Sequence, residues 1–170
     1  MVKGSEHIGR TRSIADQLID EWLPSIGGRM AINEFQGYHR FLSNFYPASV
    51  EMDKLIYPTV EHAFQAAKTA DPEARKAISK LATPGQAKRA GRNLQLRPDW
   101  EYVKLEIMKS LVIEKFTRSQ HLTEKLKATG SQELIEGNYW NDTFWGVCRG
   151  VGRNHLGRIL MQVREELAGK

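Results

Sequence analysis

The sequence predicts one compact α+β domain that is predominantly α-helical and has a few short strands. The 170 residues are 41% hydrophobic and 26% charged, an ordinary composition for a single globular domain with a sizeable core. Apolar residues recur at helical spacing through most of the chain, between Pro, Gly, Ser and Thr residues that mark ends. Extended runs are short and lie beside turn residues. Helices therefore make up most of the predicted fold.

Two segments are predicted, an N-terminal extension over residues 1–30 and the main domain over residues 31–170. Ser13 to Leu23 carries apolar residues at helical spacing, and Pro24 and two glycines then break the pattern. We expect one amphipathic helix and a linker there. The next segment is dense in aromatic residues, which is more typical of a core than of a ligand-binding wall. These aromatics are Phe35, Tyr38, Phe41, Phe45 and Tyr46, with the polar residues Arg40, Ser43 and Asn44 among them.

Cap and turn residues set the expected elements of the main domain. Thr59 follows a proline and can cap a helix through its hydroxyl, and Asp71-Pro72 and Thr83-Pro84 are similar starts. Asp53-Lys54 separates two short extended runs, which predicts a hairpin. In chain order we expect strands at 49–52 and 55–57, helices from Thr59, Asp71 and Thr83, helices at 98–118 and 120–128, a strand at 133–136, and a helix along 156–167.

The first candidate site is the helix expected after Thr59. Seven residues at about 100° each return a side chain to within about 20° of its starting direction, so Glu61, Gln65 and Lys68 are predicted to share one face. Glu61 and Lys68 would lie about 10 Å apart along the axis, which two long side chains can span around a ribose-sized ligand. A Glu and a Lys on one stripe are more often simply solvated. The surrounding alanines and Phe64 favour burial, and buried charges need a reason.

The second candidate site is the segment NYWNDTFWG, residues 138–146. Trp140, Asp142 and Trp145 combine aromatic surfaces with a carboxylate, which suits a planar base or a sugar. An Asn-Asp turn between core aromatics explains the same residues equally well. Gly146 to Arg153 follows, rich in Gly and Arg and placed before the last helix, so we predict a phosphate cradle there. It is not a dinucleotide fingerprint, because the third glycine is missing.

Charge and cysteine content limit the function classes. The net charge of +5 and the pI near 9.4 favour an anionic partner, either nucleic acid or a phosphorylated small molecule, although a solvated basic face is the default explanation. Cys148 is the only cysteine and the five histidines form no close pair, so we predict no metal and no cofactor. No apolar run approaches the roughly 20 residues of a bilayer span, and the N-terminus lacks the apolar core of a signal peptide. We expect a cytoplasmic protein without a membrane partner.

Six motifs resemble those of the NADAR family, also called YbiA-like. They are FLSNFYP, YPTVEHAFQAAK, TPGQAKRAGR, PDWEYVKLEIM, NDTFWG and RNHLGRILMQVRE, in family order from about Phe35 to Leu167. The resemblance implies a compact, mostly helical fold with a few short strands. It also implies hydrolysis of N-glycosidic bonds, in ADP-ribosylated guanine of nucleic acid or in phosphorylated ribosylamino-pyrimidine intermediates of riboflavin synthesis. The first substrate would fit a toxin–antitoxin or phage-defence setting.

The resemblance also implies site residues, position by position. It points to Glu61, Lys68, Arg92, Trp100, Asp142, Trp145, Asn154 and Gly157. Together with the patterns above, the predicted site comprises catalytic Glu61, Lys68 and Asp142, with substrate-binding Asn44, Phe45, Tyr57, Gln65, Arg92, Trp100, Trp145, Gly146, Arg153 and Asn154. Many members have a glycine two residues after the WG glycine, where this chain has Val147 and then Cys148. This departure affects the expected shape of the loop.

The chemistry of both implied substrates gives Lys68 a use. Ribose on an exocyclic amine can ring-open to an imine, so we hypothesise that Lys68 attacks the anomeric carbon, forms a Schiff base, displaces the amine and is released by water. Glu61 would act as general acid and base, and Asp142 would hold a ribose hydroxyl or share that role. The competing hypothesis is a two-carboxylate mechanism through an oxocarbenium-like state, with Lys68 only a structural partner of Glu61.

Two hypotheses of other classes stay open. In the first hypothesis, the chain binds NAD or ADP-ribose and has lost turnover. In the second, it is a basic nucleic-acid-binding protein whose family-like site is vestigial. The complete motifs EHAFQAAK and NDTFWG argue against such decay. Between the two substrates, the basic composition favours ADP-ribosylated guanine on nucleic acid, although the same arginines would also bind a phosphorylated metabolite.

Overall fold

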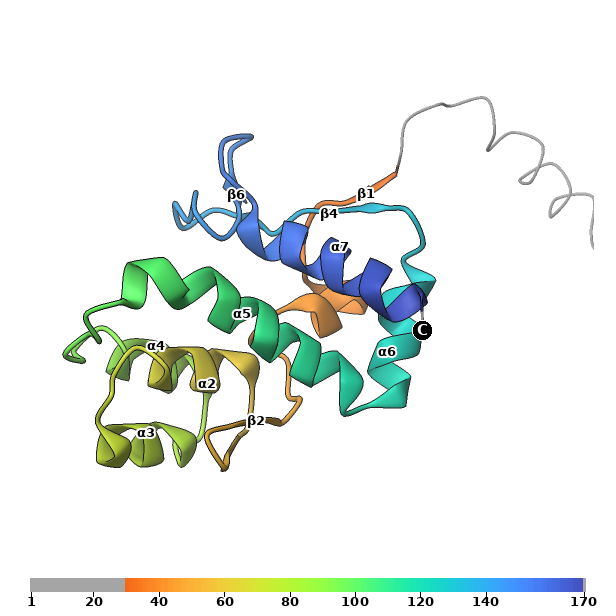
Figure 1. Cartoon of the computed structure of the whole chain (residues 1–170). Coiled ribbons are helices and arrows are strands. Elements are labelled where there is room, and N and C mark those ends of the chain that lie inside the picture. The colour runs from red at the N-terminus through yellow and green to blue at the C-terminus, as the bar shows by residue number, and fades with distance from the viewer. Residues whose placement is uncertain (1–29, 170) are drawn as a thin grey trace, which may run out of the picture.

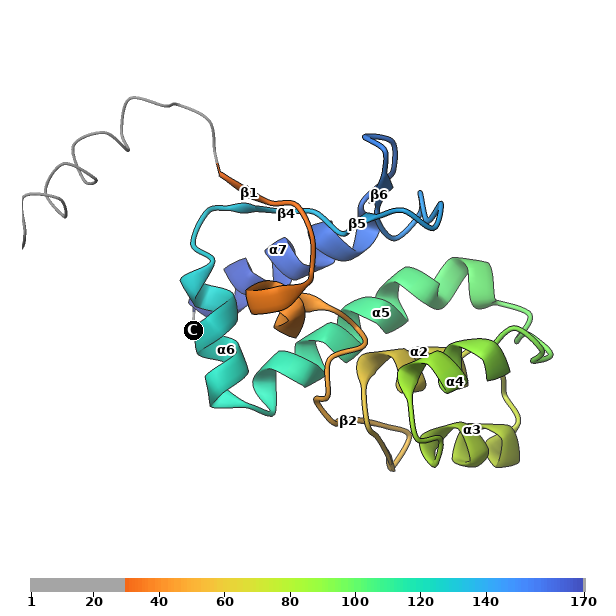
Figure 2. The same ribbon diagram turned by 180° about the vertical axis from the view of Figure 1, so that it is seen from behind.

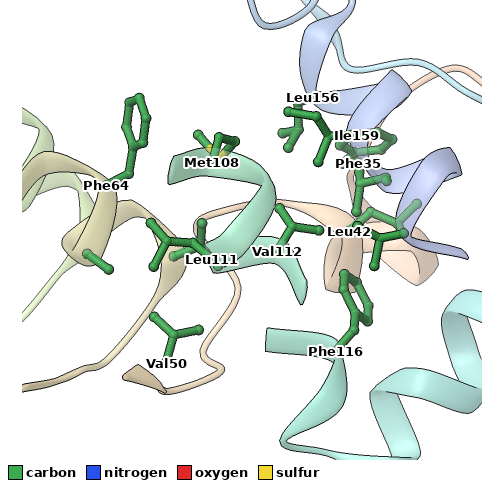
Figure 3. Packing of buried hydrophobic residues seen from close by; sticks show 14 of the residues in the cluster. Phe35, Leu42, Val50, Phe64, Met108, Leu111, Val112, Phe116, Leu156 and Ile159 are labelled. Carbon is green, nitrogen blue, oxygen red and sulfur yellow. The ribbon is translucent and has the colours of Figure 1, made fainter. Parts of the chain in front are cut away.

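Helix α5 (Trp100–Thr117) runs through the middle of the protein and supplies much of its core. The computed structural model describes residues 30–169 (Figure 1), so the helix predicted over 13–23 and its linker lie outside the described residues. The apolar face of α5 is buried between neighbours from both sides, which removes it from water. Figure 3 shows Met108, Leu111, Val112 and Phe116 of this helix packed with Phe35, Leu42, Val50, Phe64, Leu156 and Ile159.

The other helices pack on two sides of α5. One group lies on one side and contacts it through α2, and a second group lies on the other, as the two opposite views show (Figures 1 and 2). The 3-10 helix η2 (Gly37–Leu42) joins α5 through an edge contact of Phe41 with Phe116, whose ring centroids are 6.5 Å apart. The first group is α2 (Val60–Ala66), α3 (Pro72–Ser79) and α4 (Pro84–Ala90), and the second is α6 (Gln120–Ala128) and α7 (His155–Ala168).

The side-chain caps predicted for three helices are present. Thr59 and Asp71 accept hydrogen bonds from backbone N–H groups in the first turns of α2 and α3, at 3.3 and 2.9 Å. Thr83 and Gln86 form a capping box at α4, in which each side chain accepts a hydrogen bond from the other's backbone N–H. These caps satisfy N–H groups that have no partner inside the helix. The predicted starts of α2, α3 and α4 are confirmed.

The short strands of residues 30–169 form three two-stranded pairs. The hairpin is confirmed, and its turn residues Asp53 and Lys54 have left-handed φ values of 52° and 62°. The strand predicted over 133–136 ends two residues early. The fold class, helices with a few short strands, is as the sequence predicted. The antiparallel pair is β2 (Val50–Met52) with β3 (Leu55–Tyr57), and the parallel pairs are β1 (Ala31–Ile32) with β4 (Glu133–Leu134) and β5 (Gly137–Asn138) with β6 (Val147–Cys148).

A buried lysine holds the aromatic segment against α5. Lys115 is only 2% exposed, and its Nζ donates to the Ser43 carbonyl oxygen at 2.8 Å. The next carbonyl, that of Asn44, accepts the backbone N–H of Glu61 at 3.1 Å. Burial lowers the pKa of Lys115 to about 7. This segment therefore links α5 to the first turn of α2, while its exposed member Tyr38 is 80% accessible and is not part of the core.

None of the helices in residues 30–169 is long and apolar enough to cross a membrane.

Candidate active site

Helix α2 places a carboxyl and an amide side by side in the interior. Glu61 and Gln65 are only 6% and 5% exposed. The Gln65 Nε2 donates to Glu61 Oε1 at 2.9 Å, so these two residues share one helical face, as the spacing predicted. Gln65 Oε1 is buried and has no hydrogen-bond partner among residues 30–169. Burial raises the pKa of Glu61, and the hydrogen bond from Gln65 and the charges of Lys88 and Lys68 oppose this effect.

Lys68 follows α2 in a turn, whereas the sequence predicts it within the helix. Helix α2 ends at Ala66, so the spacing of seven helical residues does not apply to Lys68, and that prediction is wrong. Its N–H donates to the Gln65 carbonyl at 3.3 Å, and its own carbonyl accepts the N–H of Arg97 at 2.7 Å. A tight turn after α2 thus carries the side chain. Burial lowers the pKa of Lys68, the charge of Glu61 opposes this, and Lys88 and Arg92 lower it further.

Two further ionisable groups join this site that the sequence did not indicate. Glu136 lies between β4 and β5, and Lys88 lies on α4. Burial raises the pKa of Glu136 to about 8, with Asp142 and Glu61 adding to the rise and Lys88 opposing it. These mutual charge effects connect groups from distant parts of the chain. We call Glu61, Lys68, Lys88, Glu136 and Asp142 the acid–lysine cluster.

The sequence held only a weak signal for these two groups. Lys88 begins the basic stretch to Arg97, which reads equally well as a solvated face. Glu136 follows a short apolar run and has no spacing that connects it to Glu61. Its place in the cluster comes from the parallel pairing of β5 with β6, two-residue strands that have no alternation pattern to find.

Asp142 serves both as a turn residue and as a charge in the cluster. Its Oδ1 accepts the N–H groups of Phe144 and Trp145 at 3.1 and 2.8 Å. The Asn138 side chain closes the loop by donating to the Asp142 carbonyl at 2.8 Å and accepting the Asp142 N–H at 3.1 Å. The turn interpretation is therefore correct. The charge of Asp142 also acts on Glu61 and Glu136, which groups it with the other candidate residues.

Aromatic rings back the cluster from two sides. Phe64 of α2 touches both Trp100 and Trp145, with ring centroids 5.1 and 5.2 Å apart. Trp100 is buried and acts as a wall, whereas Trp145 is half-buried. Lys88 Nζ lies 5.7 Å from the centroid of the half-buried Phe45 ring. Phe45 thus lies beside Lys88 of the cluster, and Trp100 and Trp145 pack against α2.

Three other predicted residues make contacts that hold the scaffold. Asn154 is buried, and its side chain accepts the Glu136 N–H at 3.1 Å and donates to the Leu134 carbonyl at 2.9 Å. Gly146 packs so closely that an added Cβ would lie 2.2 Å from the Glu136 carbonyl oxygen. Arg153 is exposed, and its guanidinium lies 5.9 Å from the Phe144 ring centroid.

The phosphate cradle predicted at the start of α7 is wrong for its first N–H groups. The His155 N–H donates to the Phe144 carbonyl at 3.3 Å, and the Leu156 N–H donates to the Trp145 carbonyl at 3.0 Å. These donors are therefore occupied by the loop that precedes them. A helix N-terminus attracts an anion only through N–H groups that lack partners.

The remaining predicted residues divide between the cluster and the core. Arg92 is exposed just after α4, and its charge acts on Lys68. Asn44 contributes its carbonyl to Glu61, and its Nδ2 lies 3.4 Å from Met108 Sδ. Tyr57 is 0% exposed, and the charges acting on its hydroxyl are those of Arg75 and Asp53. Tyr57 is therefore a core residue.

One hollow of the described chain lies elsewhere and has a different lining. A hollow of about 500 Å³ lies near Tyr46, Lys115, Arg118 and His121, and contains no carboxylate in its lining. Within residues 30–169, no group of three His, Cys, Asp or Glu side chains is arranged to hold a metal ion. The acid–lysine cluster is the place where buried acids and a lysine of lowered pKa meet, which is typical of functional sites.

Comparison with known families matches residues 33–168 to the NADAR domain. The chain belongs to the NADAR family. Among solved structures, the NMR structure of the Escherichia coli protein YbiA is similar to this NADAR chain, with a TM-score of 0.75 and 36% sequence identity. That similarity covers 82% of this chain and 86% of YbiA, so it extends over the whole arrangement described above.

Relatives of this NADAR chain have two kinds of name. It is 42% identical over 132 residues to riboflavin biosynthesis protein VVA0006 of Vibrio vulnificus, covering 76% of this chain and 36% of that protein. It is 41% identical over 145 residues to riboflavin biosynthesis protein PYRR of Zea mays, covering 75% of this chain and 23% of that protein. It is 40% identical over 129 residues to N-glycosidase YbiA of Shigella flexneri, covering 74% of this chain and 80% of that protein. The chain thus spans about a third or less of the two riboflavin proteins.

Gly91→Ala is expected to disturb the Glu61–Gln65 pair. An added Cβ would lie 1.8 Å from Gln65 Oε1, so the amide must move away from Glu61. Overpacking of this kind lowers the free energy of unfolding by about 1–3 kcal/mol, which urea denaturation measures. Gly85→Ala on the same helix is the matched control, because its nearest contact would be 3.9 Å away. Equal stability of the two variants would contradict the close packing, and Gln65→Ala should relieve the Gly91→Ala defect.

Proposed function

We propose that this chain is an N-glycosidase that hydrolyses the bond between ribose C1 and an exocyclic amine, removing ADP-ribose from guanine in nucleic acid. The relative named N-glycosidase YbiA, of which this chain covers 80%, supports the bond type. The acid–lysine cluster supports the chemistry, because it supplies proton-transfer groups beside an amine nucleophile.

One observation carries the proposal, the meeting of Glu61 and Lys68 at the end of α2. Burial lowers the pKa of Lys68, which increases the fraction of free amine near neutral pH. Burial raises the pKa of Glu61, which brings it closer to the pH at which it exchanges protons efficiently. The two shifts suit a nucleophilic amine and a general acid and base.

The proposed reaction uses the ring-opened form of the substrate. Ribose on an exocyclic amine opens to an imine at C1, and the Lys68 amine adds to this carbon. Collapse of the adduct expels the base with its exocyclic amine and leaves a Schiff base between Lys68 and the sugar. Water then adds to C1, and cleavage of the C–N bond regenerates Lys68. Glu61 moves protons in these additions, and the Asp142 carboxyl, whose Oδ1 accepts the N–H groups of Phe144 and Trp145, holds a ribose hydroxyl through its other oxygen.

Lys68→Ala is expected to abolish a covalent adduct. Borohydride reduces the Schiff base, so wild-type protein incubated with substrate should gain the mass of the reduced sugar moiety. Activity in the variant should fall by about 100-fold or more, because an acid–base group alone is typically worth about 100- to 10,000-fold. Lys76→Ala on α3 is the control, since Lys76 is exposed. An active wild-type enzyme that traps no adduct would instead support the two-carboxylate mechanism.

The loops beside the cluster favour a nucleic-acid substrate. Asn138 and Cys148 are opposite each other in the parallel pair β5–β6. The residues that follow the two strands therefore leave from the same end of the pair. Tyr139 and Trp140 follow β5 and are 71% and 53% exposed. Arg149 follows β6 in a tight turn closed by two hydrogen bonds between Cys148 and Val151. Exposed rings with an adjacent arginine suit stacked bases and phosphates.

The second candidate substrate is a phosphorylated ribosylamino-pyrimidine. The relatives named riboflavin biosynthesis proteins support it, and the same ring-opening chemistry applies. Such a small molecule would reach the cluster without contacting the exposed rings. The two substrates therefore differ in their dependence on the loop after β5.

Trp140→Ala is expected to raise KM for an oligonucleotide carrying ADP-ribosylated guanine. Loss of one base–aromatic contact costs about 1–3 kcal/mol, which corresponds to roughly 5- to 100-fold. The kcat/KM for the free ADP-ribosylated guanine nucleoside should be unchanged. Tyr38→Ala is the control, because Tyr38 is exposed on η2. An equal effect of Trp140→Ala on both substrates would contradict the role of this loop.

A further inference from the structure

Glu136 has a buried carboxyl oxygen that the fold does not satisfy. Its Oε2 is inaccessible to solvent and has no hydrogen-bond partner among residues 30–169. A buried oxygen without a donor is costly if the carboxyl is ionised and much less so if it is neutral. Only two other buried side-chain atoms share this condition in the described chain, on Tyr57 and Gln65. Glu136 is therefore a carboxylic acid whose anion receives no hydrogen bond at this oxygen from the described chain.

The backbone of Glu136 is fixed on both sides. Its N–H donates to Asn154 Oδ1 at 3.1 Å, and its carbonyl accepts the Val147 N–H at 2.9 Å. Gly146 and Gly137 pack so closely that added Cβ atoms would lie 2.2 Å from neighbouring carbonyl oxygens. These contacts leave the backbone at Glu136 little freedom, and they fix the point from which its side chain leaves the chain.

Charged groups from three parts of the chain act on the Glu136 carboxyl. Asp142 from the loop after β5 and Glu61 from α2 disfavour its anion, and Lys88 from α4 favours it. Glu61 differs, because the Gln65 amide donates to it and both Lys68 and Lys88 lie near it. Burial raises the pKa of both carboxyls, but only Glu61 has a side-chain hydrogen-bond donor and a second lysine acting on it, so the two carboxyls suit different proton transfers.

We propose that Glu136 is the catalytic acid that gives its proton to the ribose ring oxygen as the sugar opens, and takes the proton back as the sugar closes. The inference rests on the proposed N-glycosidase function and adds a residue that this function did not use. Glu61 is then free to serve the proton transfers at the amine and at water.

The proton balance of this step closes within one turnover. The nitrogen lone pair forms the C1=N bond while the bond between C1 and the ring oxygen breaks, and the ring oxygen takes the Glu136 proton. After hydrolysis of the Schiff base, the sugar hydroxyl adds to the C1 aldehyde, and the proton lost from that hydroxyl returns through the carboxylate of Glu136. Lys88 lies near enough to stabilise the short-lived anion.

The pH dependence follows from the direction of the shift. Burial and the neighbouring acids raise the pKa of Glu136 to about 8, so the acid is present at neutral pH and is lost as the pH rises through that value. The wild-type kcat/KM should therefore fall on the alkaline side near pH 8. Glu136→Gln has the shape of the neutral acid but no proton to give. It should lose about 100- to 10,000-fold in kcat/KM and should no longer show the alkaline fall.

The experiment compares wild type, Glu136→Gln, Glu136→Asp and Glu133→Gln on ADP-ribosylated guanine nucleoside from pH 5 to 10. Glu133 is the matched control, because it lies on β4 just before Glu136 and is exposed. Glu136→Asp keeps an acid on a shorter side chain, so its rate should fall while the alkaline limb remains. Glu133→Gln should match wild type throughout.

A second measurement does not depend on turnover. Infrared difference spectra should show a neutral carboxyl band at pH 7 in wild type that shifts in D₂O, is lost in Glu136→Gln and persists in Glu133→Gln. An active wild-type enzyme with an unchanged alkaline limb in Glu136→Gln would overturn the role of Glu136. So would the absence of the neutral carboxyl band in wild type. Inactivity of wild type toward every N-riboside would instead overturn the proposed function itself.

Discussion

The hydrogen bond from the Glu61 N–H to the Asn44 carbonyl joins the two parts of the scaffold on which the cluster depends. On one side of it, Lys115 of α5 holds the neighbouring Ser43 carbonyl in the core. On the other side, Thr59 caps α2 and sets the direction in which Glu61 enters the interior. A buried carboxyl is tolerated only where its surroundings are fixed and partly polar. The position of Glu61 is therefore set by backbone contacts before any substrate binds.

The cluster combines groups that oppose one another electrostatically. Three acids and two lysines share a partly buried space, and no two of them form a close ion pair within the described chain. Burial disfavours the ionised forms of Glu61 and Glu136, the charge of Asp142 adds to this effect, and Lys88 opposes it. Such arrangements cost stability, and they persist where the shifted pKa values serve a reaction. Phe64 of α2 packs against Trp100 and Trp145, which fixes this helix against the segments that carry those rings.

Local chemistry was readable from the sequence, and long-range placement was not. Thr59, Asp71 and Thr83 predict helix starts because capping is a local interaction. Asp53-Lys54 predicts the hairpin for the same reason. Lys68 was placed beside Glu61 by a helical spacing that the structure does not contain, since α2 ends at Ala66. Glu136 was missed because only the pairing of β5 with β6 and the Asn154 side chain bring it there. The first N–H donors of α7 are occupied by carbonyls of the preceding loop, a pairing that the sequence does not reveal.

The position of the bound sugar is tested most directly by a structure with ADP-ribose bound. The ribose C1 should lie within about 3–4 Å of Lys68 Nζ, which is the distance from which a nucleophile attacks. Glu61 and Glu136 should lie on either side of that carbon. ADP-ribose seated instead in the hollow beside Lys115 and His121, away from the acid–lysine cluster, would contradict the account.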